Sequence, residues 1–88
     1  MIGVKDAAHQ AYNYLKELLP GIQDILLEEV EMDEERKHWL VTLSFFIKPE
    51  RPTSPILNLT GFEKQYKTFK IDADNGEVLS MKIRELQK

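Results

Sequence analysis

The sequence has 88 residues, of which 42% are hydrophobic and 31% are charged, and its formal net charge is −3. This length supports one domain with a single modest core, and the composition is that of an ordered globular protein. The lack of cysteine excludes disulfides, thiolate metal sites and a cysteine nucleophile. The net charge favours neither a nucleic-acid binder nor a polyanion mimic, and the acidic excess is concentrated between Asp24 and Glu35.

The first predicted element is a helix over about residues 4–19. Its apolar residues recur at spacings of three and four and form one stripe, the pattern of a helix that packs against a core. These residues are Val4, Ala8, Ala11, Tyr12, Leu15, Leu18 and Leu19. Pro20 and Gly21 end the helix, because proline cannot continue it and glycine suits a left-handed cap. The stripe predicts core packing rather than a ligand site.

A strand is predicted over about residues 25–32, and the sequence leaves its register open. Leu26 and Val30 belong to one face of this strand, whereas Ile25 and Leu27 belong to the other. A β-bulge near Glu28 would reconcile the two halves of the strand.

The clearest strand covers about residues 38–48 and follows a polar turn at residues 33–37. Its odd-numbered residues are all apolar, which predicts that they face the core. They are Trp39, Val41, Leu43, Phe45 and Ile47. The even-numbered residues, among them Leu40 and Phe46, are therefore predicted to lie on the outer face of the sheet.

Residues 49–61 contain three of the four prolines and show no periodicity. A connection of this length is unusual in so small a domain, so we interpret it as either a functional loop or an excursion from the fold.

Two more strands are predicted over about residues 62–72 and 77–86. The turn between them contains Asn75 and Gly76, which supply the positive backbone angles of a tight hairpin, and Asp72, which can cap the turn. The predicted pairs are Ile71 with Leu79 and Phe69 with Met81, with Ile83 continuing the same core-facing side.

The order of elements predicts a single α+β domain over residues 1–88. Each strand can pair with its neighbour in sequence, which gives a four-stranded antiparallel meander. The N-terminal helix then covers the apolar face of this sheet, so the fold has two layers.

The second hairpin also carries a family resemblance. Tyr66–Ala73 running into Asn75–Leu79 resembles the strand, turn and returning strand of a PepSY-type domain, a small α+β module related in shape to cystatin and monellin. The N-terminal helix, with Ala7-Ala8, Ala11 and Leu15, occupies the equivalent place. The resemblance implies an extracytoplasmic module, linked to peptidase propeptides, that binds or inhibits rather than catalyses.

A weaker similarity is to small bacterial immunity-type proteins, through Trp39 and the turn at residues 72–77. It implies a protein that neutralises a toxin. Neither resemblance brings catalytic residues.

Several residue sets that could carry chemistry fail on spacing. An EF-hand that begins at Asp72 would need glycine at its sixth place and glutamate at its twelfth, where the sequence has Glu77 and Ile83. His9 and His38 have no second histidine at the spacing of a zinc site. Neighbouring carboxylates such as Glu28 and Glu29 point to opposite faces of a strand. We predict that the protein is not an enzyme and uses no cofactor or metal.

The outer sheet face is the predicted interaction surface. Leu40 and Phe46 form an apolar patch there, near Tyr66 and Val78, and the patch has a basic rim. The full set of predicted partner-binding residues is Leu40, Phe46, Tyr66, Lys70, Lys82 and Arg84. This surface predicts a non-enzymatic protein-interaction module, inhibitory or self-associating, whose partner is another protein or a second copy of the chain.

Two alternatives stay open at this stage. The basic side chains of Lys70, Lys82 and Arg84 could contact nucleic acid through phosphates, although the net charge disfavours it. A small enzyme or ligand-binding domain that uses His38 and the 49–61 loop would need a pocket beside that histidine.

No apolar run approaches the roughly 20 residues of a membrane span, and the start is unlike a signal peptide, so a cytoplasmic location is expected.

Overall fold

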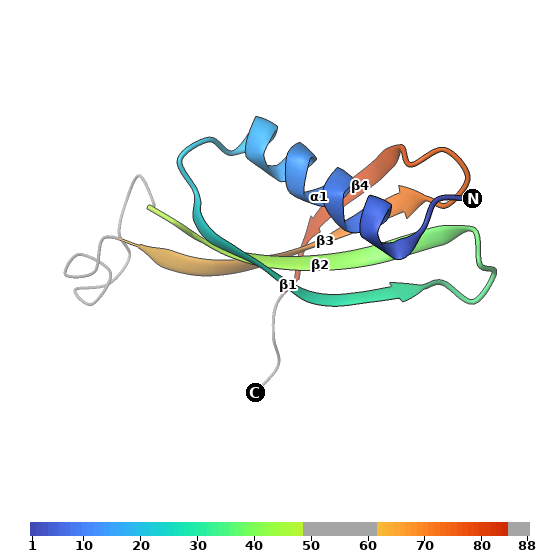
Figure 1. Cartoon of the computed structure of the whole chain (residues 1–88). Helices are drawn as coiled ribbons and strands as arrows, with labels where there is room; N and C mark the ends of the chain where they lie inside the picture. Colours follow the sequence, from blue (N-terminus) through green and yellow to red (C-terminus); the bar gives the residue numbers. More distant parts are fainter. Residues whose placement is uncertain (49–61, 85–88) are drawn as a thin grey trace.

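The computed structural model describes residues 1–48 and 62–84. It contains helix α1 (Val4–Leu18) and strands β1 (Gln23–Met32), β2 (His38–Ile47), β3 (Glu63–Asp72) and β4 (Val78–Ile83). The strands form one antiparallel sheet in the order β1-β2-β3-β4, and α1 lies across one of its faces (Figure 1). The predicted two-layer α+β fold is confirmed. The predicted loop at 49–61 lies outside the described residues, as do residues 85 and 86 of the last predicted strand.

Helix α1 packs on the sheet through small and branched residues one turn apart. Ala7, Ala11 and Leu15 are fully buried, at the i, i+4 spacing that places side chains on one face of a helix. The Asp6 carboxylate accepts a hydrogen bond from the backbone N–H of Gly3 at 3.3 Å, which satisfies one of the free donors at the helix start. The helix ends before the Pro20-Gly21 turn, as predicted.

The core lies between α1 and the two central strands. Val41, Leu43 and Phe45 of β2 are buried, together with Phe69 and Ile71 of β3. The predicted inward orientation of the odd-numbered residues of β2 is therefore confirmed. Trp39 and Ile47, at the two ends of β2, are half-buried and pack against the edge of the core.

Strand β1 contains the predicted β-bulge. Leu27 pairs with Leu43, but the next pair along the ladder joins Glu29 to Thr42, so Glu28 is the extra residue. A second irregularity lies between Gln23 and Leu26. The bulge turns Val30 toward the helix and places the glutamates that follow it on the outer face.

The last hairpin differs from the prediction by one residue. The pair of Phe69 with Met81 is confirmed, but Ile71 pairs with Val78 instead of Leu79. The cause is the turn, which bonds the N–H of Asp72 to the carbonyl of Glu77 at 2.9 Å. Between this bond and the pair of Phe69 with Met81, β4 has one residue more than β3. The register therefore shifts, and Val78 packs on the core.

The predicted burial of Leu79 and Ile83 is consequently wrong. The Leu79 side chain is 46% exposed and that of Ile83 is 72% exposed. Leu79 is the extra, unpaired residue at the register shift. The C-terminal end of β4 runs away from α1 (Figure 1), so the helix does not cover Ile83.

Candidate functional site

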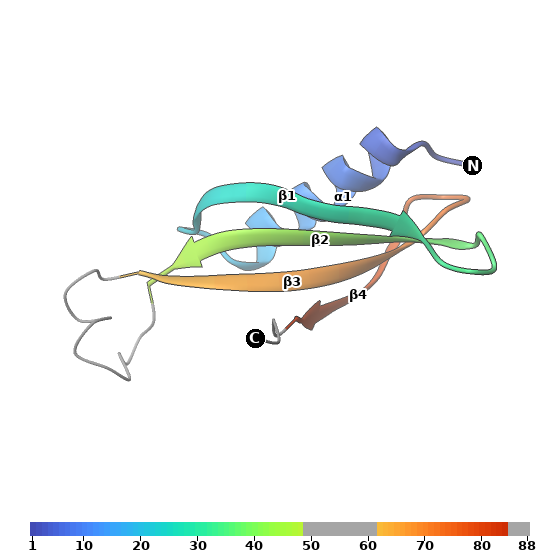
Figure 2. The same ribbon diagram turned by 90° about the horizontal axis from the view of Figure 1, so that it is seen from below.

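The outer sheet face is the face opposite α1, and Figure 2 views it with the helix behind the sheet. Leu40 and Phe46 both lie on it and are half-buried, opposite Lys70 and Lys64 respectively. Phe46 lies near Tyr66 as predicted, because the Lys64 ammonium contacts both rings. Its Nζ is 5.8 Å from the centroid of Phe46 and 5.4 Å from that of Tyr66, which is cation–π distance.

The predicted single apolar patch is not present on this face. Thr42 and Ser44 separate Leu40 from Phe46 along β2, at about 3.3 Å per residue. Val78, predicted nearby, packs on the opposite side with the core, because the register shift in β4 turns it there. The outer face therefore has two separate apolar ends and a polar centre.

The polar centre is buried although it lies on the side away from the helix. Thr42 is 3% exposed and Ser44 is fully buried. The two threonine hydroxyls of Thr42 and Thr68 lie 3.0 Å apart, and Ser44 donates a hydrogen bond to Glu28 Oε2 at 2.6 Å. These bonds satisfy the polar groups that the burial removes from water.

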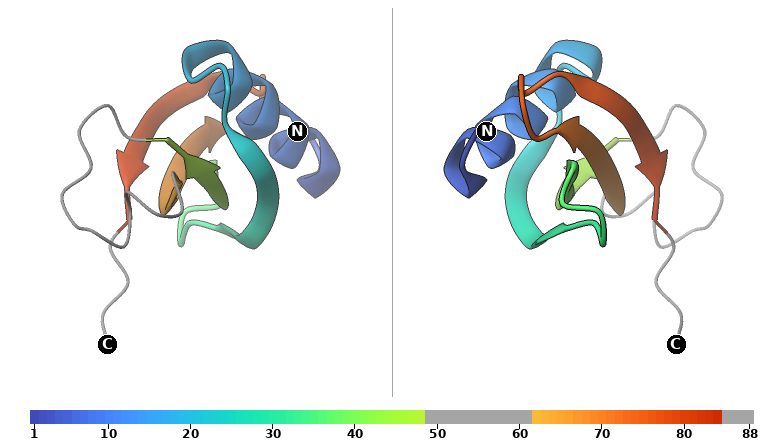
Figure 3. Two further views of the ribbon diagram at one scale, coloured as in Figure 1. Left: turned by 90° about the vertical axis from the view of Figure 1, so that its left-hand side faces the viewer. Right: turned by 90° about the vertical axis from the view of Figure 1, so that its right-hand side faces the viewer.

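Arg84 closes the polar centre from the other edge of the sheet. Its Nη1 donates to Glu29 Oε1 at 2.7 Å and to Thr42 Oγ1 at 3.1 Å. The hydrogen bond and charge of Glu29 raise the pKa of Arg84. Glu29 belongs to β1 and Arg84 follows β4, so this ion pair joins the two edges of the twisted sheet, which Figure 3 shows from both ends. Arg84, predicted as part of a basic rim, is therefore a link across the outer face.

Charge is divided across this face. The acidic residues Glu28, Glu29 and Glu31 come from β1, at one edge. The basic residues come from β3, from the edge strand β4 and from the position that follows it, and they are Lys64, Lys70, Lys82 and Arg84. The predicted basic residues Lys70, Lys82 and Arg84 therefore share this face with acidic residues from the run between Asp24 and Glu35.

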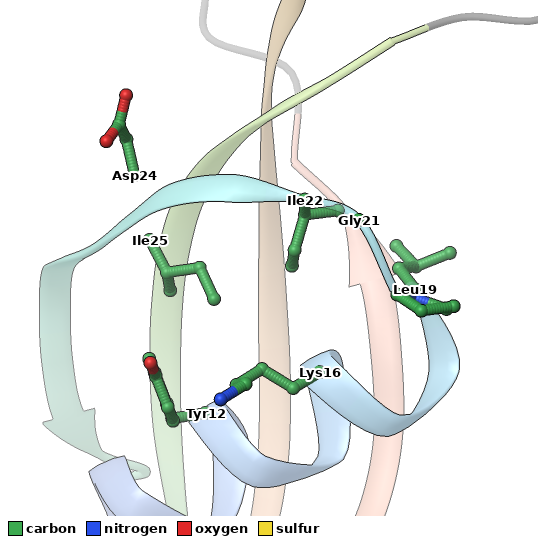
Figure 4. A pocket seen from close by; sticks show the side chains of 8 residues that line it. Tyr12, Lys16, Leu19, Gly21, Ile22, Asp24 and Ile25 are labelled. Atoms are coloured by element: carbon green, nitrogen blue, oxygen red, sulfur yellow. The ribbon is translucent and has the colours of Figure 1, made fainter.

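A second candidate surface is the groove between α1 and β1, which we call the α1–β1 groove. It contains two neighbouring hollows of about 450 and 350 Å³. The first is lined by Tyr12, Lys16, Leu19, Pro20, Gly21, Ile22, Asp24 and Ile25 (Figure 4). The second is lined by Ala8, His9, Tyr12, Ile25, Leu27 and Leu43. Tyr12 and Ile25 belong to both, so the hollows adjoin.

This groove was not predicted from the sequence. Tyr12 was predicted to pack in the core, yet it is 39% exposed, and Leu27 is 52% exposed. The Lys16 ammonium lies 5.2 Å from the centroid of the Tyr12 ring, at the mouth of the first hollow. Residue spacing gave no signal for the groove, because spacing does not fix the distance between α1 and β1.

The two histidines have different surroundings. His38 Nδ1 lies 2.7 Å from Asp33 Oδ2, and Asp33 Oδ1 accepts the backbone N–H groups of Lys37 and His38. The His38 hydrogen bond is the largest of several that lower the pKa of Asp33. This arrangement holds the β1–β2 turn, and neither hollow of the α1–β1 groove includes His38. His9 lines the second hollow.

Within residues 1–48 and 62–84, no group of three or more metal-ligating side chains is close enough to hold a metal ion. No helix in the same part of the chain is long and apolar enough to cross a membrane.

In comparisons with known proteins, no family model, no curated protein and no solved structure matches the chain. The resemblances to PepSY-type domains and to immunity-type proteins stay predictions.

Proposed function

We propose that the chain is a non-enzymatic protein-interaction module that pairs with a second copy of itself through the outer sheet face. The observation that carries the proposal is the division of charge on this face, with acids on β1 and bases on β3 and β4. Among the described residues, no helix or strand covers this face (Figure 2).

The division of charge makes the face complementary to itself. A two-fold axis that lies in the interface, parallel to the strands, places β1 of one copy over β4 of the other. Glu31 of each copy then approaches the side that carries Lys82 and Lys70 in its partner, and every contact occurs twice. An axis across the strands places β1 over β1, where the glutamates repel each other. Electrostatics thus selects one orientation.

The same axis brings like ends of the two sheets together. The Leu40 end of one copy meets the Leu40 end of the other, and the Phe46–Tyr66 end does likewise. Aromatic side chains are common anchors of protein interfaces, and Phe46 and Tyr66 both belong to this face. The apolar ends supply contact area, and the charged residues supply orientation.

Sedimentation velocity tests this proposal without a known partner. We expect the wild type to dimerise, the Lys82→Glu variant to dimerise more weakly, and added salt to weaken the wild-type dimer. The double variant Lys82→Glu with Glu31→Lys reverses both signs and is expected to recover part of the association. Lys5→Glu, the same change on α1, is the matched control. A wild type that stays monomeric up to its solubility limit would refute the proposal.

The alternative of nucleic-acid contact has less support. It depends on Lys70, Lys82 and Arg84, and Arg84 already bonds Glu29 and Thr42. The acidic residues of β1 also share the face.

An inhibitory or toxin-neutralising role would use the same surface to bind a different protein. The complex with that protein would then be weakened by the Lys82→Glu change.

A further inference from the structure

We infer that the α1–β1 groove binds an extended, acidic and apolar peptide segment of a partner protein. This second surface lies on the helix side of the sheet, so it is independent of the outer sheet face and goes beyond the proposed self-association. The inference stands on three properties of the groove: its length, its apolar floor and the sign of charge along its helical wall.

The length suits a short extended segment. The helical wall runs from Ala8 to Leu19, which is roughly 17 Å at about 1.5 Å per residue. About five residues of extended chain cover the same distance at about 3.3 Å each. Alternate side chains of such a segment point the same way, about 7 Å apart, so two of them can enter the two adjoining hollows.

The floor of the second hollow is apolar and partly in contact with water. Ile25 and Leu27 come from β1, and Leu43 comes from β2 below them. Figure 4 shows Ile22 and Ile25 pointing toward α1. The Leu27 side chain is 52% exposed, so a ligand can bury apolar surface there that the fold leaves in water.

The helical wall carries the Lys16 ammonium at the first hollow and His9 at the second. Lys5, His9 and Lys16 recur at spacings of four and seven, which places them on one stripe of α1 at 3.6 residues per turn. Lys5 lines neither hollow, but it continues this stripe toward the start of the helix. The acidic residues Asp6 and Glu17 fall about 100° away around the helix, on its other flank.

The opposite wall adds little negative charge to the groove. Asp24 borders the first hollow, but its carboxylate points away from the other lining side chains (Figure 4). Glu29 and Glu31 lie on the outer face because of the bulge at Glu28. An apolar second hollow beside the Lys16 ammonium of the helical wall is complementary to a segment that combines apolar and acidic residues.

The bulges in β1 favour recognition by side chains over addition of a strand. A regular edge strand presents evenly spaced backbone groups that a peptide can pair with. The two register irregularities of β1 disrupt that spacing between Gln23 and Glu29, the part of the strand that borders the groove. The occupant is therefore held by its side chains in the two hollows and by ion pairs with α1.

Titration by heteronuclear NMR tests the inference with two synthetic peptides of about five residues, one alternating glutamate with leucine and one alternating lysine with leucine. We expect the acidic peptide to shift the backbone amides of Tyr12, Lys16 and Ile25, and the basic peptide to leave them unchanged. Lys16→Glu is expected to raise the Kd of the acidic peptide at least about threefold. Leu27→Gln, which keeps the charge and removes apolar contact, is expected to raise it as well.

The matched control is Lys82→Glu, which makes the same charge change on the outer sheet face. It is expected to weaken self-association and to leave peptide binding unchanged, whereas Lys16→Glu does the reverse, so the two proposals can fail separately. Equal shifts with both peptides, shifts confined to the outer face, or no shifts at millimolar peptide would each overturn the groove assignment. An unchanged amide spectrum elsewhere shows that each variant is folded.

Discussion

Leu27 and Leu43 pair directly across β1 and β2, yet Leu27 is 52% exposed and Leu43 is 3% exposed. The same substitution at the two positions therefore measures how open the α1–β1 groove is. Leu43→Ala removes a buried side chain and leaves a cavity, which costs about 2–5 kcal/mol. A fully buried leucine contributes about 1.5–3 kcal/mol by transfer from water, so Leu27→Ala, at half burial and without a cavity, is expected to cost about 0.7–1.5 kcal/mol.

Urea unfolding can measure this difference, because a domain of this size has a total stability of roughly 4–13 kcal/mol. The fluorescence of Trp39, the single tryptophan, and far-UV circular dichroism should give coincident transitions. Equal costs at the two positions, or a larger cost at Leu27, would refute the open groove and with it the proposed peptide site.

Two further predictions concern turns. The hydrogen bond from His38 holds the pKa of Asp33 below its ordinary value of 3.8, so the stability that this carboxylate contributes is complete above that value and is lost as pH falls through the lower folded-state pKa. Asp33→Asn should therefore destabilise the protein at pH 7 and have a smaller effect at about pH 3, as urea unfolding at both pH values will show. Gly76→Ala and Gly21→Ala should each lower Tm, because both glycines have positive φ, where a side chain costs about 1–2 kcal/mol. The new Cβ has room at both positions: at Gly76 it would make an ordinary contact with Gln10 Nε2 at 3.4 Å, and at Gly21 it would meet nothing within 4 Å. An unchanged Tm for either variant in calorimetry would contradict this reasoning.

The sequence predicts the fold well because its periodicities are local and strong. The odd-numbered apolar residues of β2 define a face without reference to the rest of the chain. The predicted stripe of α1 was right in part: it contained the buried Ala11 and Leu15, but it omitted Ala7 and included Val4 and Leu18, which are 42% and 49% exposed. The bulge at Glu28 was also predictable, because a regular strand cannot place both Leu27 and Val30 on one face. The register of the last hairpin was not predictable, since it depends on which backbone groups the turn at Asp72 bonds.

The candidate surfaces were harder to predict because they depend on exposure. Alternation places Leu40 and Phe46 on the outer face correctly, but it cannot show that Thr42 and Ser44 separate them as a buried polar centre. The polar centre is joined by contacts that are distant in sequence, since Arg84 bonds both Thr42 and Glu29, the latter from 55 residues away. Exposure at Tyr12 and Leu27 likewise depends on how closely α1 approaches β1, and residue spacing carries no information on that distance.

The irregularities at Glu28 in β1 and at Leu79 in β4 have a consequence for solubility. They fall on the two strands that end the sheet, where unpaired backbone groups would otherwise template a neighbouring chain. Each irregularity interrupts the even spacing that fibril growth from a strand edge requires. Copies of this domain can therefore meet face to face without extending into a continuous ribbon.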